Sequence, residues 1–208
     1  MFDFIADLDE YFCEKYANYD KLCVLQGYRM PKMQDTKVDE FGRTYAYTLP
    51  ADTMRLALQE NKKQLLANLK TRITDKTFSF SFRTVGFFSR IRNVFSKYAP
   101  HKWLSATLSR NAVTAEEAGN ALNIQPEIWR GIVKGKYMPT KNTLFSLALT
   151  AHIGAEDIKN LLLINGYEWD FTVEKDVVVC YLLEQKVFNR DMIDKALAEY
   201  NIGNLFIK

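Results

Sequence analysis

Past Trp103 the chain is divided into short amphipathic segments, each bounded by residues that start and stop helices. Thr114 precedes one segment and Glu117 follows three positions later, a pair typical of a capping box. Pro126 suits the first turn of the next segment, which ends at Gly135. The pattern predicts helices over residues 115–122, 126–134, 140 or 142–151, a following segment that ends near 166, 174–185 and 190–200.

Before Pro100 the chain mixes helical and extended patterns. Thr77 to Phe82 alternates hydroxyl and phenyl side chains, which predicts a half-buried strand, and the apolar period changes to 3.6 after Gly86. The patterns predict helices over 2–17, 52–73 and 87–98, and strands over 22–30, 44–49 and 77–82, the first two as a candidate hairpin.

These patterns predict an α+β protein that is mainly α. A length of 208 residues suits two small domains, and the chain shows no internal repeat. We expect a small α+β domain over 1–100, a boundary at Pro100, and an all-helical domain over 101–208. The apolar residues of the last two helices need a covering surface, either the preceding helices or the interface of a homodimer or partner.

Charge is unevenly distributed along the chain. Residues 1–61 hold 7 basic and 11 acidic residues (net −4), residues 62–102 hold 10 and 1 (net +9), and residues 103–208 hold 11 and 13 (net −2). A polyanion is therefore expected to bind the middle segment. Its candidate phosphate-binding residues are Lys70, Arg72, Lys76, Arg83, Arg90, Arg92 and Lys97.

Aromatic residues are interleaved with these cations. Alternation in 77–82 and a single stripe about 120° wide in 87–98 predict that the phenylalanines belong to the core. Two other interpretations of the basic segment stay open: a solvated or partner-facing surface, and a helix over Phe87–Tyr98 that lies on a membrane surface, since Arg and Lys flank its aromatic face.

A stretch from Trp103 to Asn165 resembles a known family. Four features carry the resemblance: Glu116-Glu117-Ala118 at a helix start, Leu122-Asn123-Ile124 in a turn, Gly135-Lys136-x-x-Pro139 after the next helix, and the apolar run Thr143–Leu149. In these features the stretch resembles lambda-repressor-like (XRE-type) helix-turn-helix domains. The resemblance implies a bacterial DNA-binding protein that regulates transcription.

The resemblance also implies which residues contact DNA. In a helix-turn-helix the second helix presents its first residues to base edges in the major groove. The corresponding base-reading residues here are Gln125, Glu127, Ile128 and Arg130, and those facing phosphates are Lys134, Lys136 and Lys141. Family members often have Gln where this chain has Ala115, and Pro126 and Glu127 also depart from a phosphate-facing helix start. An adaptor that binds proteins and no longer binds DNA is therefore the alternative.

Other functional classes find little support in the sequence. Three cysteines at wide spacing and two isolated histidines indicate neither a disulfide framework nor a metal site, and no nucleophile elbow or phosphate-cradling glycine loop occurs. We expect a protein that is not an enzyme and has no cofactor. The acidic start of the chain lacks a basic n-region, and no apolar run is long enough to span a bilayer, so we expect a cytoplasmic protein.

Overall fold

The computed structural model describes residues 3–17, 34–39, 42–48, 62–75, 82–203 and 205. Ten helices and two small antiparallel sheets lie within these residues, so the fold is α+β and mainly α, as predicted. The elements are α1 (Phe4–Lys15), β1 (Gln34–Val38), β2 (Thr44–Thr48), α4 (Lys62–Lys70), β3 (Arg83–Thr84), α5 (Phe87–Phe95), α6 (Pro100–Arg110), α7 (Ala115–Ala121), α8 (Pro126–Val133), β4 (Tyr137–Met138), α9 (Lys141–Thr150), α10 (Ala155–Ile164), α11 (Glu174–Glu184) and α12 (Arg190–Glu199).

The chain forms two compact units. The larger unit combines Met1–Tyr16 with Ile73–Lys208, and the smaller unit is Ala17–Arg72. This division differs from the boundary expected at Pro100. The apolar period of the first helix showed that it has a face to bury, but not that its partner is α11, which lies in the other half of the sequence.

The described part of the smaller unit holds a hairpin and α4. β1 pairs with β2 in an antiparallel register from Gln34↔Thr48 to Val38↔Thr44. Gly42 has a φ of +75° in the connecting turn, where glycine avoids the strain of the left-handed region.

Strand 44–49 was therefore predicted almost correctly, but its partner lies at 34–38, between the two strands predicted as a hairpin. The predicted strand 22–30 and the first part of the predicted helix 52–73 lie outside the described residues. That helix ends at Lys70, three residues before the predicted end.

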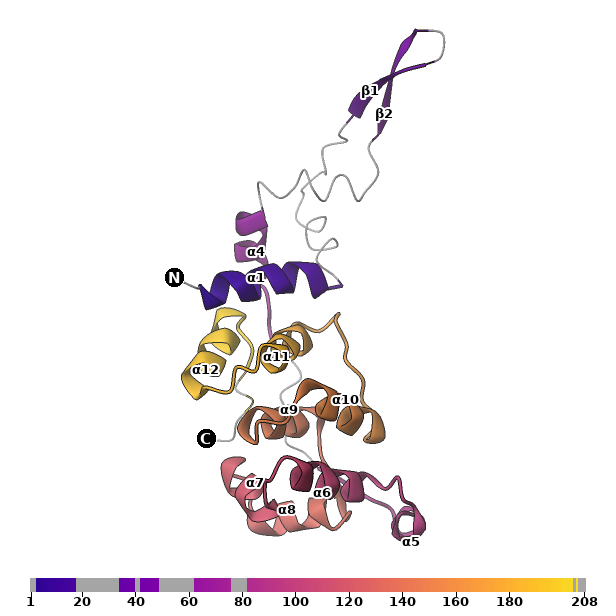
Figure 1. Ribbon diagram of the computed structural model, residues 1–208, viewed down its shortest axis with the longest axis vertical. Helices are drawn as coiled ribbons and strands as arrows, with labels where there is room; N and C mark the ends of the chain where they lie inside the picture. The colour runs from indigo at the N-terminus through magenta and orange to yellow at the C-terminus, as the bar shows by residue number, and fades with distance from the viewer. Residues whose placement is uncertain are drawn as a thin grey trace. The chain divides into compact units, whose positions relative to one another are not determined.

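In the larger unit, α11 occupies the centre. All its residues from Lys175 to Leu183 are buried. It packs against α1, α9, α10 and α12 (Figure 1). Because α11 is enclosed, the packing of the C-terminal helices on the preceding helices is confirmed for this helix.

Three tyrosine–carboxylate hydrogen bonds hold α1 on this core. The hydroxyl groups donate from Tyr16 to Glu174 (2.6 Å), from Tyr181 to Asp7 (2.6 Å) and from Tyr200 to Asp9 (2.8 Å). Burial, together with the neighbouring carboxylates, raises the pKa of Tyr181 and of Tyr200. The neutral tyrosines therefore act as donors at neutral pH.

A buried ion pair fixes the chain where it enters the larger unit. The Lys175 ammonium lies 2.7 Å from Asp75 Oδ2. The same carboxylate oxygen accepts the backbone N–H of Gly203 at 2.9 Å, and Lys175 also donates to Asn142 Oδ1 at 3.3 Å. Asp75, just after the smaller unit, is thus linked through Lys175 to α11 and α9, and directly to Gly203 after α12.

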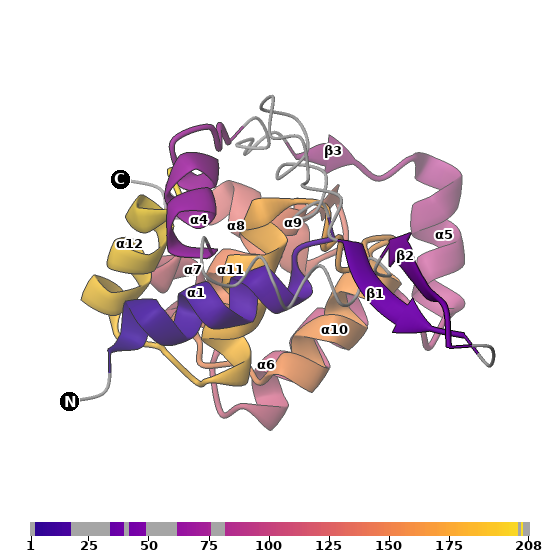
Figure 2. The same ribbon diagram turned by 90° about the horizontal axis from the view of Figure 1, so that it is seen from above.

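Helices α7 to α12 agree to within two residues with the bounds that the sequence predicted, whereas no bounds were predicted for α6. Thr140 caps α9 by accepting the N–H of Thr143 at 3.1 Å, and Asn189 caps α12 by accepting that of Met192 at 3.1 Å. One feature contradicts the prediction of helices only: Tyr137–Met138 forms β4, which pairs with β3. Figure 2 shows β3 leading into α5 at the edge of the larger unit.

Candidate nucleic-acid interface

Helices α7 and α8 follow one another across a short turn. The Thr114 hydroxyl accepts the Glu117 N–H at 3.1 Å, and Glu117 Oε2 accepts the Thr114 N–H at 2.8 Å, so the predicted capping box is confirmed. These hydrogen bonds lower the pKa of the Glu117 carboxyl. The start of α7 is therefore set by local interactions alone.

The two helices pack closely through a glycine and a tryptophan. A Cβ atom on Gly119 would lie 2.4 Å from Trp129 Cδ1, a distance that real contacts do not show. The indole N–H of Trp129 donates to the Ala115 carbonyl in α7. Trp129 and Ile132 are buried. This packing fixes which face of α8 is left for solvent.

That outer face carries the residues predicted to read bases. Gln125, Glu127 and Arg130 are exposed, and Ile128 is half-buried. Lys134 and Lys136, predicted to meet phosphates, are exposed at the end of α8. No ion pair among the described residues involves Arg130, Lys134 or Lys136. These cations are available to an anionic partner.

The basic segment joins α8 at this same end. Val85 N–H donates to the Lys136 carbonyl at 2.9 Å, and an Arg90 guanidinium nitrogen lies 3.4 Å from the same oxygen. Arg83 pairs with Met138 in the β3–β4 ladder. Arg83 and Arg90 are both exposed. Two cationic stretches that are far apart in the sequence therefore meet in space.

Sequence reasoning missed this junction. The β3–β4 ladder has only two residue pairs, Arg83↔Met138 and Thr84↔Tyr137. Two residues are too few to show the period of a strand. The available signal was Gly135 followed by Tyr137 and Met138 after a helix stop, which is typical of a turn into an extended segment.

One predicted phosphate-binding residue, Lys141, has its charge paired inside the protein. Lys141 was expected to face phosphate, but its ammonium is bound to the buried Asp176 carboxylate, so it serves the fold. Burial raises the pKa of Asp176, and the hydrogen bond from Lys141 opposes that effect. Lys70 and Arg72 belong to the smaller unit. Lys76 lies outside the described residues.

Helix α5 also corrects the sequence interpretation. Phe87, Phe88 and Phe95 were expected in the core, yet Phe88 and Phe95 are each 84% exposed. The stripe is present as predicted, but no described element covers it. Phe82 is half-buried and precedes β3; the other residues of the predicted strand 77–82 lie outside the described residues. Arg92 and Lys97 flank the stripe and are exposed.

Carboxylates lie close to the proposed reading surface. Glu116 is exposed in the first turn of α7, and Glu127 is exposed in the first turn of α8. A helix N-terminus carries partial positive charge, which attracts carboxylates as well as phosphates. Pro126 has no N–H to offer an anion. Glu116 and Glu127 thus weaken the binding of anions at the starts of α7 and α8.

Within the described residues no group of three His, Cys, Asp or Glu side chains lies close enough to hold a metal ion. A cavity of about 30 Å³ lies beside His101, lined in part by Gly135, Tyr137 and Asn165. Burial and the nearby Lys102 charge lower the pKa of His101. A space of this size suits a water molecule, since one water occupies about 30 Å³ of liquid.

Comparisons with protein-family models, with curated proteins and with solved structures found no match. Among the helices that the structure describes, none has the length and apolarity needed to cross a bilayer.

Proposed function

We propose that this chain is a non-enzymatic, cytoplasmic protein with a regulatory role that binds nucleic acid, and that duplex DNA is its partner. The observation that supports this most is the junction at Lys136, which brings Arg83 and Arg90 to the end of α8 that carries Lys134. The resemblance of residues 103–165 to repressor-like domains gives the proposal its mode of docking.

In this proposal α8 enters the major groove. An α-helix with its side chains is about 10–12 Å in diameter, which fits a groove about 12 Å wide. Gln125 and Arg130 offer the amide and guanidinium groups that pair with adenine and guanine edges. Lys134, Lys136, Arg83 and Arg90 then neutralise phosphates beside the groove.

The test is the salt dependence of binding. Four phosphate contacts, one for each of these four cations, predict a slope of about −3.6 for log affinity against log salt concentration, or a fall in affinity of roughly 150-fold between 50 and 200 mM salt. Fluorescence anisotropy of the full chain with a labelled mixed-sequence DNA duplex measures this slope, and an RNA duplex tests the kind of nucleic acid. Absence of binding to either duplex at the lower salt concentration refutes the proposal.

A charge-matched pair of variants locates the surface. Lys134→Glu/Lys136→Glu should reduce the slope by about 2, because each lost phosphate contact removes roughly one unit. Lys159→Glu/Lys195→Glu makes the same charge change at exposed positions on α10 and α12 and should leave the slope nearly unchanged. An equal reduction of the slope in both double variants would mean that the net charge of the protein, and not this surface, drives binding.

A protein-interaction adaptor is the second candidate. The exposed carboxylates of Glu116 and Glu127 at the starts of α7 and α8 support it, since they repel phosphates where a reading helix approaches DNA. Glu127→Gln separates the candidates. Duplex affinity should rise if α8 approaches the phosphates and stay unchanged if α8 docks on a protein.

A further inference from the structure

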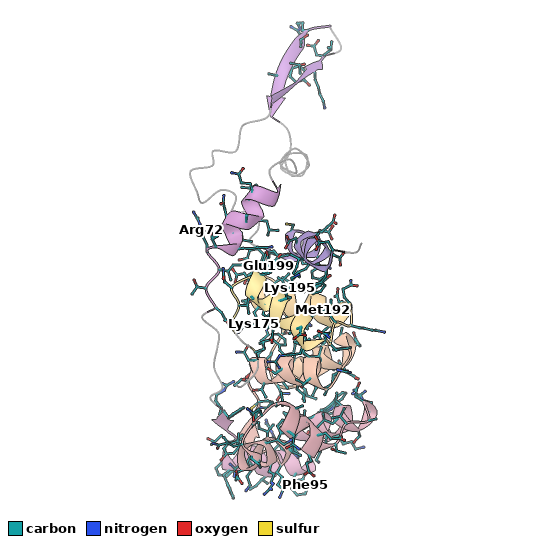
Figure 3. The ribbon with its side chains drawn as sticks, turned by 90° about the vertical axis from the view of Figure 1, so that its left-hand side faces the viewer. Arg72, Phe95, Lys175, Met192, Lys195 and Glu199 are labelled. Atoms are coloured by element: carbon teal, nitrogen blue, oxygen red, sulfur yellow. The ribbon has the colours of Figure 1, made fainter. Side chains whose placement is uncertain are left out.

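The aromatic face of α5 carries an inference beyond nucleic-acid binding. This face comprises the exposed side chains of Phe87, Phe88, Ile91, Val94, Phe95 and Tyr98. Monomeric soluble proteins rarely expose so many adjacent large apolar side chains without a function for them. Figure 3 places Phe95 at the opposite end of the larger unit from Lys195 and Glu199.

The polar side of α5 is anchored, which turns the aromatic face outward. Arg90 lies within 3.4 Å of the Lys136 carbonyl near the start of the helix. At its end, the Lys102 ammonium donates to the carbonyl groups of Val94 (2.7 Å) and Ser96 (3.0 Å). Asn93, opposite the apolar stripe, lines the cavity beside His101. The polar side of α5 therefore packs on the rest of the larger unit, and its aromatic side faces solvent.

Cations border the aromatic face on both sides. At 100° per residue Arg90 and Lys97 lie on one flank and Arg92 lies on the other. Between Asp75 and Glu116 the sequence has no acidic residue. The segment that carries the face thus has cations and no carboxylate, and its partner should be anionic where it meets the flanks and apolar where it meets the stripe.

We infer that α5 binds the surface of an anionic membrane. An interfacial helix buries an apolar face at the headgroup and acyl boundary and places Arg and Lys among anionic headgroups, which is the arrangement of α5. The helix has nine residues, about 14 Å in length, so it lies on the bilayer and does not cross it.

Two other occupants fit the face less well. A second copy of the chain would bring the cationic flanks of two α5 helices together, and like charges repel. Single-stranded nucleic acid stacks on aromatic rings, but Ile91 and Val94 interrupt the rings with aliphatic side chains that offer no π face. A bilayer accepts both kinds of side chain.

Vesicle sedimentation of the full chain tests the inference. The chain should sediment with phosphatidylcholine vesicles that contain phosphatidylserine and much less with vesicles of phosphatidylcholine alone. Phe88→Glu should lower the bound fraction at least about tenfold, since it removes one large apolar side chain from the interface. Leu163→Glu on α10 is the matched control, because Leu163 is 61% exposed but lies outside the face, and it should sediment normally.

Three results would overturn the inference. The first is that the chain does not sediment with anionic vesicles. The second is that Phe88→Glu and Leu163→Glu lose vesicle binding equally. The third is that Phe88→Glu loses self-association or single-stranded nucleic-acid binding while its vesicle binding persists. Circular dichroism checks that each variant is folded, and Phe95→Ser repeats the test without adding charge. Duplex binding by Lys134 and Lys136 is measured separately, so either proposal can fail alone.

Discussion

Replacing Lys175 by methionine should destabilise the larger unit strongly. The side chains of Lys175 and Asp75 are 3% and 6% exposed, and their charged atoms lie 2.7 Å apart. Methionine fills a similar volume but removes the cation, so the buried Asp75 carboxylate loses the ammonium group beside it. Breaking a buried pair from one side costs about 3–5 kcal/mol.

A double substitution isolates the cause of that loss. Asp75→Asn with Lys175→Met removes both charges and keeps an amide oxygen that can accept the Gly203 N–H. We expect this variant to recover most of the loss, since replacing both partners of a buried pair is often close to neutral. With the single variant Asp75→Asn measured as well, the coupling between the two charges is the loss of the double variant minus the sum of the two single losses.

Urea unfolding at neutral pH, followed by tryptophan fluorescence and circular dichroism, measures both effects. Lys159→Met on α10 is the control, because Lys159 is exposed, and its effect should stay within about 0.5 kcal/mol. A decrease of less than about 1 kcal/mol in the free energy of unfolding of Lys175→Met would contradict the reasoning. So would a double variant whose loss equals the sum of the two single losses.

Three further predictions concern α1 and α7. Because burial and Asp7 raise the pKa of Tyr181, the stability that its neutral hydroxyl contributes is full below the ordinary tyrosine pKa of about 10 and is lost as pH rises above it. The melting temperature should therefore fall less steeply with rising pH in Tyr181→Phe than in the unsubstituted protein. An equal fall in both proteins would exclude this contact as the cause. Thr114→Ala should cost about 1 kcal/mol in urea unfolding, since it removes the cap of α7; no change would mean that water replaces the cap. Gly119→Ala should cost about 1–3 kcal/mol despite better helix propensity, because its methyl group collides with Trp129; a more stable variant would show that the indole can move.

The sequence predicted those parts of the fold that depend on neighbours along the chain. The start of α7 depends on Thr114 and Glu117, which are three residues apart, so its cap was visible in the sequence. The role of Lys141 depends on Asp176, 35 residues away, and no local pattern indicates that this cation is neutralised. Local rules therefore located the helices but not their ionic partners.

The same distinction applies to the candidate site. The resemblance to helix-turn-helix domains placed Gln125, Glu127 and Arg130 on a reading face, and the side chains of all three are exposed. The period of α5 likewise defined an apolar face, but whether a face is covered depends on what packs against it, and a period contains no such information. The contact of Arg90 with Lys136 spans 46 residues and rests on a ladder too short to predict.

The position of α1 has a consequence for how the protein folds during synthesis. Tyr16 and its acceptor Glu174 are 158 residues apart, and the smaller unit lies between them in the chain. The ribosome releases α1 long before α11 exists, so the apolar side of α1 must remain exposed or bound by a chaperone until the residues of α11 have emerged. Closing this long loop late should make docking of α1 a slow step of folding.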